Sequence, residues 1–296
     1  MAKIGFIGLG NMGTPMAGNL AKKGHQVRGF DLVKANLEAA GKRGVEAAGS
    51  AADAVQGAEV VVTMLPAGKD TVAVYDKAGV LQAAGKGTVF IDSSTIDVAS
   101  ARRAHDLAKV AGMLSLDAPV SGGVGGAEAA TLTFMAGGSK DAFEKAKPVL
   151  EAMGKRVVHC GDAGAGQAAK ICNNMILGIS MIGVAEAFVL AEKLGLSHQA
   201  LFEVASSSSG QCWSLTNYCP VPGPVPNAPS NNKYKPGFAS ALMLKDLKLA
   251  QEAASAAGAT TLLGAAAAQM FALHNAWGEG GADFSGIIHL IRGRQG

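Results

Sequence analysis

This sequence has few cysteines and a small net charge, and each of these features excludes a class of protein. The 296 residues include four cysteines, none of them in a CxxC pair or a Cys/His cluster with zinc spacing. We therefore expect reduced thiols and no metal site. The net charge is only +3, and no run of lysine and arginine forms a basic stripe, which argues against a nucleic-acid partner.

Long apolar runs are missing as well. Met175–Ala185 is the most apolar stretch, and polar residues bound it on both sides. It is about half as long as the ~20 residues that cross a bilayer, so we expect a buried core helix and no membrane partner. The chain opens on a strand-like run, residues 3–7, which leaves no room for a targeting peptide and predicts a cytoplasmic protein.

The sequence does contain a regular alternation up to about residue 160. Hydrophobic residues make up 49% and charged residues 17% of the chain, as in a soluble globular protein, and the length suits two domains. Short β-branched runs separated by helical segments predict a parallel, doubly wound sheet. The expected strands are residues 4–7, 27–30, 60–64, 89–91 and 114–116, with 131–136 and 156–159 extending the sheet.

The character changes at Gly164, after which the pattern predicts helices alone. A long helix is expected at about 165–194, followed by helices near 198–206, 240–257, 260–276 and 284–292. Ser206–Gly237 interrupts them with six of the ten prolines, and it also holds Trp213. Because aromatics are only 5% of the chain, we expect an ordered loop that covers a pocket; a flexible tether is the alternative.

A dinucleotide-binding pattern lies at the first strand-to-helix turn. Residues 8–13 have the pattern GxGxxG, in the order Gly8, Leu9, Gly10, Asn11, Met12 and Gly13. This loop places a helix N-terminus at a pyrophosphate, and Asp31, about twenty residues on, can accept from both ribose hydroxyls. The pattern predicts an NAD site in an α/β Rossmann-type N-terminal domain (1–163), joined by the long helix to an all-α C-terminal domain (164–296).

Two other strand ends fall where such a sheet binds its ligand. Leu65 and Pro66 follow the third expected strand, and Ser93, Ser94 and Thr95 follow the fourth. Ordinary turn chemistry explains these residues equally well when they are taken without the glycine pattern.

Two further segments predict substrate chemistry. Ser121, Gly122 and Gly123 offer a hydroxyl and backbone N–H groups to a carboxylate, although a structural turn fits equally well. Lys170 precedes Asn173 and Asn174 at helical spacings of three and four. A lysine partly desolvated beside a bound nicotinamide is expected to have a lowered pKa and to act as a general base; a solvated first turn is the alternative.

Together these segments resemble the β-hydroxyacid dehydrogenase family. Four motifs occur in the family's order, at 8–13, 117–127, 166–174 and 245–246. The resemblance implies that Lys170 is the catalytic acid/base and that Ser121, Gly122 and Gly123 contact the substrate carboxylate. It further implies that Asn174 positions the substrate, that Thr95 lies at the nicotinamide and that Lys245 lies near the cofactor. Without the resemblance, Lys245 and Asp246 read as a surface ion pair.

Ser209–Ser214 and the proline-rich residues after it resemble the 3-hydroxyisobutyrate branch of that family. This branch implies NAD-dependent oxidation of 3-hydroxyisobutyrate to methylmalonate semialdehyde, a step of valine breakdown, by a homodimer or homotetramer. Trp213 is then expected to shape the substrate pocket. The alternatives are a sister enzyme for L-serine or tartronate semialdehyde/glycerate, a non-catalytic family member, and an imine reductase. Members of the last two classes usually lack the lysine.

Overall fold

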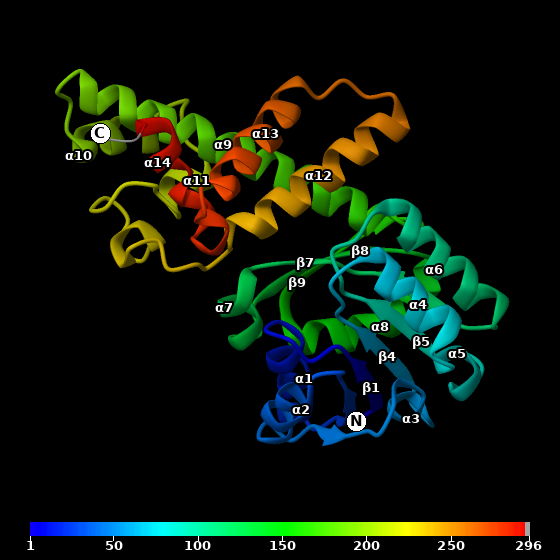
Figure 1. Cartoon of the computed structure of the whole chain (residues 1–296). Coiled ribbons are helices and arrows are strands. Elements are labelled where there is room, and N and C mark those ends of the chain that lie inside the picture. Colours follow the sequence, from blue (N-terminus) through cyan, green and yellow to red (C-terminus); the bar gives the residue numbers. More distant parts are fainter. Residues whose placement is uncertain (294–296) are drawn as a thin grey trace. The chain divides into compact units, whose positions relative to one another are not determined.

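The computed structural model describes residues 1–293, and it divides the chain into two compact units, Met1–Lys170 and Ile171–Gly296 (Figure 1). The division falls inside a continuous helix, α9 (Ala165–Lys193), directly after Lys170. The predicted domain boundary between residues 163 and 164 lies just before this helix and stays a prediction.

A nine-stranded sheet forms the centre of the N-terminal unit, in the order β3-β2-β1-β4-β5-β6-β8-β7 with β9 paired to β8. The strands within the described residues are β1 (Lys3–Ile7), β2 (Gln26–Phe30), β3 (Glu46–Ala47), β4 (Val60–Thr63), β5 (Val89–Asp92), β6 (Leu114–Asp117), β7 (Val120–Ser121), β8 (Leu132–Gly137) and β9 (Gly154–Gly161). The first six in this order pair in parallel, which confirms the predicted fold class.

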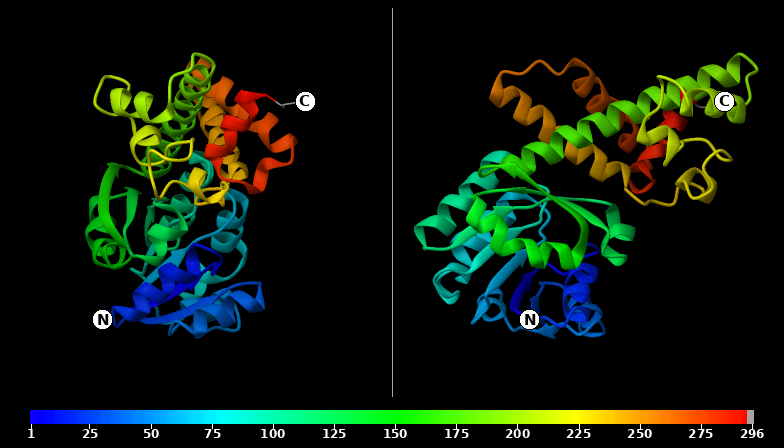
Figure 2. Two further views of the ribbon diagram at one scale, coloured as in Figure 1. Left: turned by 90° about the vertical axis from the view of Figure 1, so that its left-hand side faces the viewer. Right: turned by 180° about the vertical axis from the view of Figure 1, so that it is seen from behind.

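Helices cover both faces of this sheet (Figures 1 and 2). Val60 and Val62 pack into one core with α1 and α8, whereas Val61, which lies between them, packs into a second core. Strands buried on both faces are typical of parallel sheets. The helices are α1 (Gly13–Lys22), α2 (Lys34–Gly41), α3 (Ala51–Val55), α4 (Gly68–Lys77), α5 (Val80–Ala83), α6 (Val98–Val110), α7 (Gly123–Glu128) and α8 (Lys140–Met153).

One end of the sheet departs from the predicted parallel pattern. β8 pairs antiparallel with β6 and β7, and β9 then pairs parallel with β8. Only residues 122–131 connect β7 to β8, and a parallel pair needs a crossover of a dozen or more residues. The short connection therefore reverses the chain direction within and just after the motif at residues 117–127.

The C-terminal unit is helical, and after β9 the described part of the chain has no strand beyond an isolated bridge between Ala239 and Asp283. Its elements after α9 are α10 (His198–Ser206), α11 (Trp213–Thr216), η1 (Pro229–Asn232), α12 (Ser240–Ala257), α13 (Leu262–Ala276), η2 (Glu279–Gly281), η3 (Phe284–Gly286) and α14 (Ile287–Arg292). Within residues 1–293, α9 alone has the length and composition of a membrane span. It contributes Met181 and Phe188 to the core of this unit, as expected of a core helix.

The proline-rich segment 206–237 is an ordered loop. Ser230 Oγ donates to the carbonyls of Cys219 and Val221, at 2.8 and 3.1 Å, and Tyr234 Oη donates to Pro220 O at 2.8 Å. Cys219 and Val221 are fully buried. The tether alternative is therefore wrong, while the expectation that the loop covers a pocket stays a prediction.

Candidate functional site

The glycines of the first turn serve two purposes. A Cβ on Gly8 would lie 2.3 Å from Met64 O, and a Cβ on Gly13 would lie 1.9 Å from Gly8 O, so the packing of the chain itself requires these two glycines. A Cβ on Gly10 would meet nothing within 4 Å. The space above Gly10 is open at the start of α1, whose N-cap residue Met12 makes no side-chain cap. A phosphate can therefore approach the first turn of α1 closely.

Asp31 lies directly after β2, next to that turn. Its Oδ2 accepts from Leu9 N–H at 2.6 Å, and its Oδ1 accepts from Val33 N–H at 2.7 Å. Each carboxylate oxygen has about two acceptor positions, so each retains one for a ribose hydroxyl. These bonds fix the carboxylate beside the glycine turn, as an adenosine ribose site requires.

The two remaining strand-end segments are joined to each other. Leu65 N–H donates to Ser94 Oγ at 2.8 Å, which holds the loop after β4 against the loop after β5. Because β2, β1, β4 and β5 are consecutive in the sheet, a dinucleotide whose adenosine lies at Asp31 extends over Gly10 toward Leu65, Pro66 and Thr95. The residues present fit NAD along this edge.

The buried carboxylate of Asp92, which sequence reasoning missed, holds the loop that directly follows β5 (the β5 loop, residues 93–97). Asp92 Oδ1 accepts from Thr63 Oγ1 at 2.7 Å, from Ser94 Oγ at 2.6 Å and from Ser94 N–H at 3.2 Å. Within the described residues Oδ2 has no hydrogen-bond partner. Burial raises the pKa of Asp92 to about 6, although the three donated bonds act in the opposite direction.

Asp117, the first residue of the substrate motif, holds the start of α9. Its Oδ1 accepts from Gly164 N–H and its Oδ2 from Gln167 N–H, both at 2.8 Å. His105 Nε2 lies 2.9 Å from the same Oδ1, and Ser115 Oγ lies 2.7 Å from His105 Nδ1. This Ser-His-Asp order is that of a hydrolase triad. Here, however, the aspartate caps a helix, and the adjoining cavity of about 10 Å³ leaves room for at most about one water.

The predicted carboxylate receptor lies between β7 and α7. Ser121 ends β7, and Gly122 and Gly123 both have positive φ, at 131° and 61°. Only glycine adopts such conformations readily. Helix geometry leaves the first N–H groups of α7 without intrahelical acceptors. These features suit a carboxylate, and the roles of the three residues stay predictions.

Lys170 lies in the second turn of α9 and is 7% exposed. Asn174 follows one turn later and is also buried, and its Nδ2 donates to Asp246 Oδ2. Asn173 is exposed and donates to Asn174 Oδ1 at 2.9 Å. Of the three polar residues expected to share a face, the structure buries two, and the solvated-turn alternative does not describe Lys170.

Lys245 and Asp246 do not form the surface pair expected of the isolated dipeptide. Asp246 is 3% exposed, and Lys245 Nζ lies 3.9 Å from its Oδ1. The spacing of Met243, Asp246 and Leu247 on α12 could have revealed this, because it places the carboxylate on the apolar face. Within the C-terminal unit, Asp246 thus links Asn174 with Lys245.

Trp213 begins α11 and is 50% exposed. Its indole stacks on Tyr218 at 4.9 Å between ring centroids, and Tyr218 stacks on Phe284 at 5.3 Å. Tyr218 Oη donates to Asp283 Oδ2 at 2.8 Å. The tryptophan is therefore the exposed end of an anchored aromatic stack; its contact with substrate stays a prediction.

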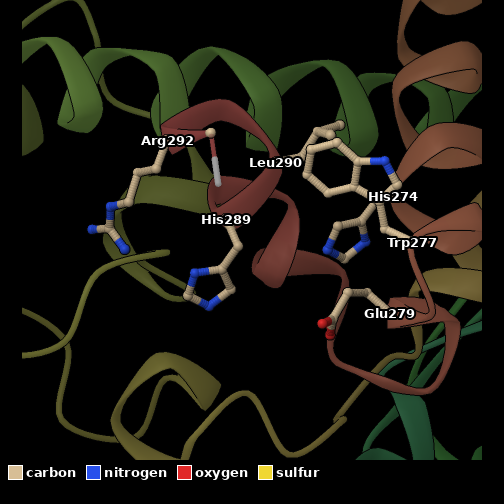
Figure 3. A pocket seen from close by; sticks show the side chains of 7 residues that line it. His274, Trp277, Glu279, His289, Leu290 and Arg292 are labelled. Atoms are coloured by element: carbon tan, nitrogen blue, oxygen red, sulfur yellow. The ribbon is translucent and has the colours of Figure 1, made fainter. Parts of the chain in front are cut away.

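A cavity of about 400 Å³ lies elsewhere in the C-terminal unit (Figure 3). His274, Trp277, Glu279, His289, Leu290, Arg292 and Gly293 line it. None of the predicted site residues is among them, and Glu192 already pairs with Arg292. Burial lowers the pKa of both histidines. Within residues 1–293 no three His, Cys, Asp or Glu side chains converge as a metal site needs.

Comparison with known proteins agrees with this geometry. Residues 3–161 match the NAD binding domain of 6-phosphogluconate dehydrogenase, and residues 164–291 match the NAD-binding domain of NADP-dependent 3-hydroxyisobutyrate dehydrogenase. A probable 3-hydroxyisobutyrate dehydrogenase of Mycobacterium bovis is 54% identical over 99% of both chains. The chain belongs to the β-hydroxyacid dehydrogenase family. It is an NAD-dependent oxidoreductase with an NAD-binding N-terminal domain.

Two other members of the β-hydroxyacid dehydrogenase family bear on the substrate. The solved structure of Mycobacterium tuberculosis 3-hydroxyisobutyrate dehydrogenase with L-serine has a TM-score of 0.96 and 54% identity, covering 99% of this chain and 100% of that one. An NAD-dependent L-serine dehydrogenase of Pseudomonas aeruginosa is 47% identical over the full length of both chains.

Proposed function

We propose that this β-hydroxyacid dehydrogenase oxidises 3-hydroxyisobutyrate to methylmalonate semialdehyde, with NAD as hydride acceptor and Lys170 as the acid/base. The observation that carries the proposal is the burial of Lys170 one turn after Gln167, whose N–H donates to Asp117. Asp117 also begins the segment that contains Ser121, Gly122 and Gly123. Asp117 thus holds the start of the helix that bears the predicted proton acceptor, and it lies four residues before the predicted carboxylate receptor.

The proposed reaction uses these groups in turn. The Ser121 hydroxyl and the backbone N–H groups of Gly122 and Gly123 bind the substrate carboxylate, which leaves the terminal CH₂OH for reaction. Neutral Lys170 Nζ takes the hydroxyl proton while one hydride leaves the same carbon for NAD. The carbon becomes an aldehyde, and the reduced cofactor and the protonated lysine are the other products. Asn174 is the proposed positioning group for the hydroxyl.

L-serine is the second candidate substrate, because the relative at 47% identity is an L-serine dehydrogenase and the solved structure at 54% identity is that of the enzyme with L-serine. It presents the same CH₂OH two carbons from a carboxylate, with an ammonium in place of a methyl group. A hydrophobic pocket discriminates such pairs by the cost of burying the charge. We assign this selection to Trp213, which is apolar and half-exposed.

The deciding experiment measures NADH formation with 3-hydroxyisobutyrate, L-serine, glycerate and 3-hydroxypropionate under one set of conditions. We expect the highest kcat/KM for 3-hydroxyisobutyrate. A higher value for L-serine or glycerate would transfer the assignment to the sister enzymes, and no turnover of any acid would support the non-catalytic alternative.

We also infer that the chain acts in the cytoplasm as a homodimer or homotetramer. Most of its exposed large apolar side chains lie in the C-terminal unit, and they include Ile176, Leu190 and Leu194 along and just beyond α9. Large exposed apolar patches mark interaction surfaces. Light scattering on the purified protein tests the assembly, and a monomer at working concentration would contradict it.

A further inference from the structure

The side chain of Gln167 joins two segments of the N-terminal unit that are far apart in sequence. It is fully buried; its Oε1 accepts from Ile96 N–H at 3.1 Å, and its Nε2 donates to Ser94 O at 2.7 Å. The amide therefore pairs with the backbone on both sides of Thr95, as a neighbouring strand would. An amide that pairs both ways in a buried site is held in a single orientation.

The helical turn that carries this amide is fixed independently. Gln167 N–H donates to Asp117 Oδ2. A Cβ on the preceding Gly166 would lie 2.3 Å from Met135 O and 2.4 Å from Asp117 O, so this turn lies directly against the backbone of β6 and β8. Because Lys170 follows Gln167 by one turn, the amide ties the loop at Thr95 to the turn that bears the lysine.

We propose that Gln167 is a positioning residue that sets the nicotinamide half of NAD against Lys170, by holding Thr95 at a fixed place on the β5 loop. The direction of the cofactor follows from the sheet: adenosine at Asp31 after β2, pyrophosphate over Gly10 after β1, and the second nucleoside toward β4 and β5. The inference rests on the proposed function, because it takes Lys170 to be the acid/base.

Binding of two nucleotides tests this inference without a hydroxyacid. ADP-ribose has the adenosine, pyrophosphate and second ribose of NAD but lacks the nicotinamide. Gln167→Met keeps the length of the side chain and removes both hydrogen bonds. By calorimetry we expect it to weaken NAD binding about tenfold, the scale of one or two lost hydrogen bonds, and to leave ADP-ribose binding within about twofold. Equal losses for both nucleotides, or no loss for either, would overturn the proposal.

A second variant covers the case in which Gln167→Met does not fold. Gln167→Glu places a carboxylate against Ser94 O at high pH, whereas its protonated form can again donate to that carbonyl. Burial raises a carboxyl pKa, so the affinity ratio of NAD to ADP-ribose should recover in this variant as the pH falls from about 8 to about 6. A ratio independent of pH, as we expect in wild type, would count against the proposal.

Ser139→Ala is the matched control. Ser139 Oγ accepts from Ala142 N–H and caps α8 in the same unit, so its loss costs a comparable amount of stability without touching the β5 loop. It should leave both nucleotide affinities unchanged, and a change in the NAD/ADP-ribose ratio in this variant would contradict the specific role of Gln167. If wild type does not oxidise 3-hydroxyisobutyrate, the proposed function fails while the two affinities still decide the role of Gln167.

Discussion

Lys170 is the only buried lysine in the described part of the chain. Burying an amine is costly unless the site uses it, so Lys170→Ala should lower kcat by at least about 10²-fold, the usual scale for a positioned acid/base. NAD affinity should change little, because the lysine serves the reacting alcohol. Lys248→Ala, at an exposed site on α12, is the control. Near-native turnover of the Lys170 variant would remove it from the mechanism.

Asp31 should make the enzyme prefer NAD to NADP. The 2′-phosphate of NADP and the Asp31 carboxylate would repel each other by about 4 kcal/mol at a separation of ~4 Å and an effective dielectric near 20. A third of that energy corresponds to about a tenfold difference in affinity. Lys34, the first cation after Asp31 along the chain, partly offsets this repulsion, while Glu38 at 4.0 Å from its Nζ limits the effect, so we expect residual NADP use. The test is kcat/KM for both cofactors in wild type and Asp31→Ser; a preference for NADP in wild type, or an unchanged ratio in the variant, contradicts the assignment.

Asp92 should make the free energy of unfolding depend on pH. Its folded pKa of about 6 exceeds the ordinary value of 3.8, so the folded state binds more protons between these values and loses stability as the pH rises through them. Asp92→Asn keeps an acceptor for Thr63 and Ser94 and removes the charge. The stability of this variant minus that of wild type should therefore rise from about pH 4 to about pH 6 and then level off.

Urea unfolding at a series of pH values measures that difference for Asp92→Asn. Asp76→Asn, at an exposed position of α4, is the control for loss of one carboxylate. A difference that falls with rising pH, or that the control reproduces, would refute the role of Asp92.

At the scale of single elements, the ordered loop 206–237 is the segment that we expect to set substrate preference. Trp213 is the exposed end of a stack whose inner rings are Tyr218, which donates to Asp283, and Phe284. Trp213→Ala should therefore raise KM or reorder the substrates more than it lowers Tm. Substrate kinetics and thermal unfolding of the same preparation check this, and a large fall in Tm with unchanged substrate order would make the tryptophan a packing residue only.

Local patterns predicted the parallel strands and the helices because alternation and periodicity act over a few residues. The predicted helices 198–206 and 240–257 agree with α10 and α12. The two-residue strands β3 and β7 were missed, since two residues carry no alternation. The antiparallel direction of β8 was missed because it depends on the length of one connection.

The site was predictable only in part, for the same physical reason. Glycine spacing, Asp31 and Lys170 are visible in the sequence, and the structure puts the first two together and buries the third. Gln167 and Asp92 act through partners many residues away, and no sequence spacing reveals such pairs. The roles of the predicted substrate residues stay predictions.

At the scale of the whole molecule, the two units use their apolar residues differently. The sheet of the N-terminal unit buries its strands between two layers of helices. The C-terminal unit leaves Leu190, Leu194, Leu262 and Leu263 exposed.

The exposed side of α9 has a consequence for how the enzyme is handled. Ile176 and Leu190 on this helix are exposed in the single chain, and the proposed association of copies would cover them. Association follows mass action, and Tm should then rise with protein concentration. After dilution of the protein by about a hundredfold, specific activity should decline with time, and it should recover when the protein is concentrated again. A Tm and specific activity independent of concentration would show that one chain is sufficient.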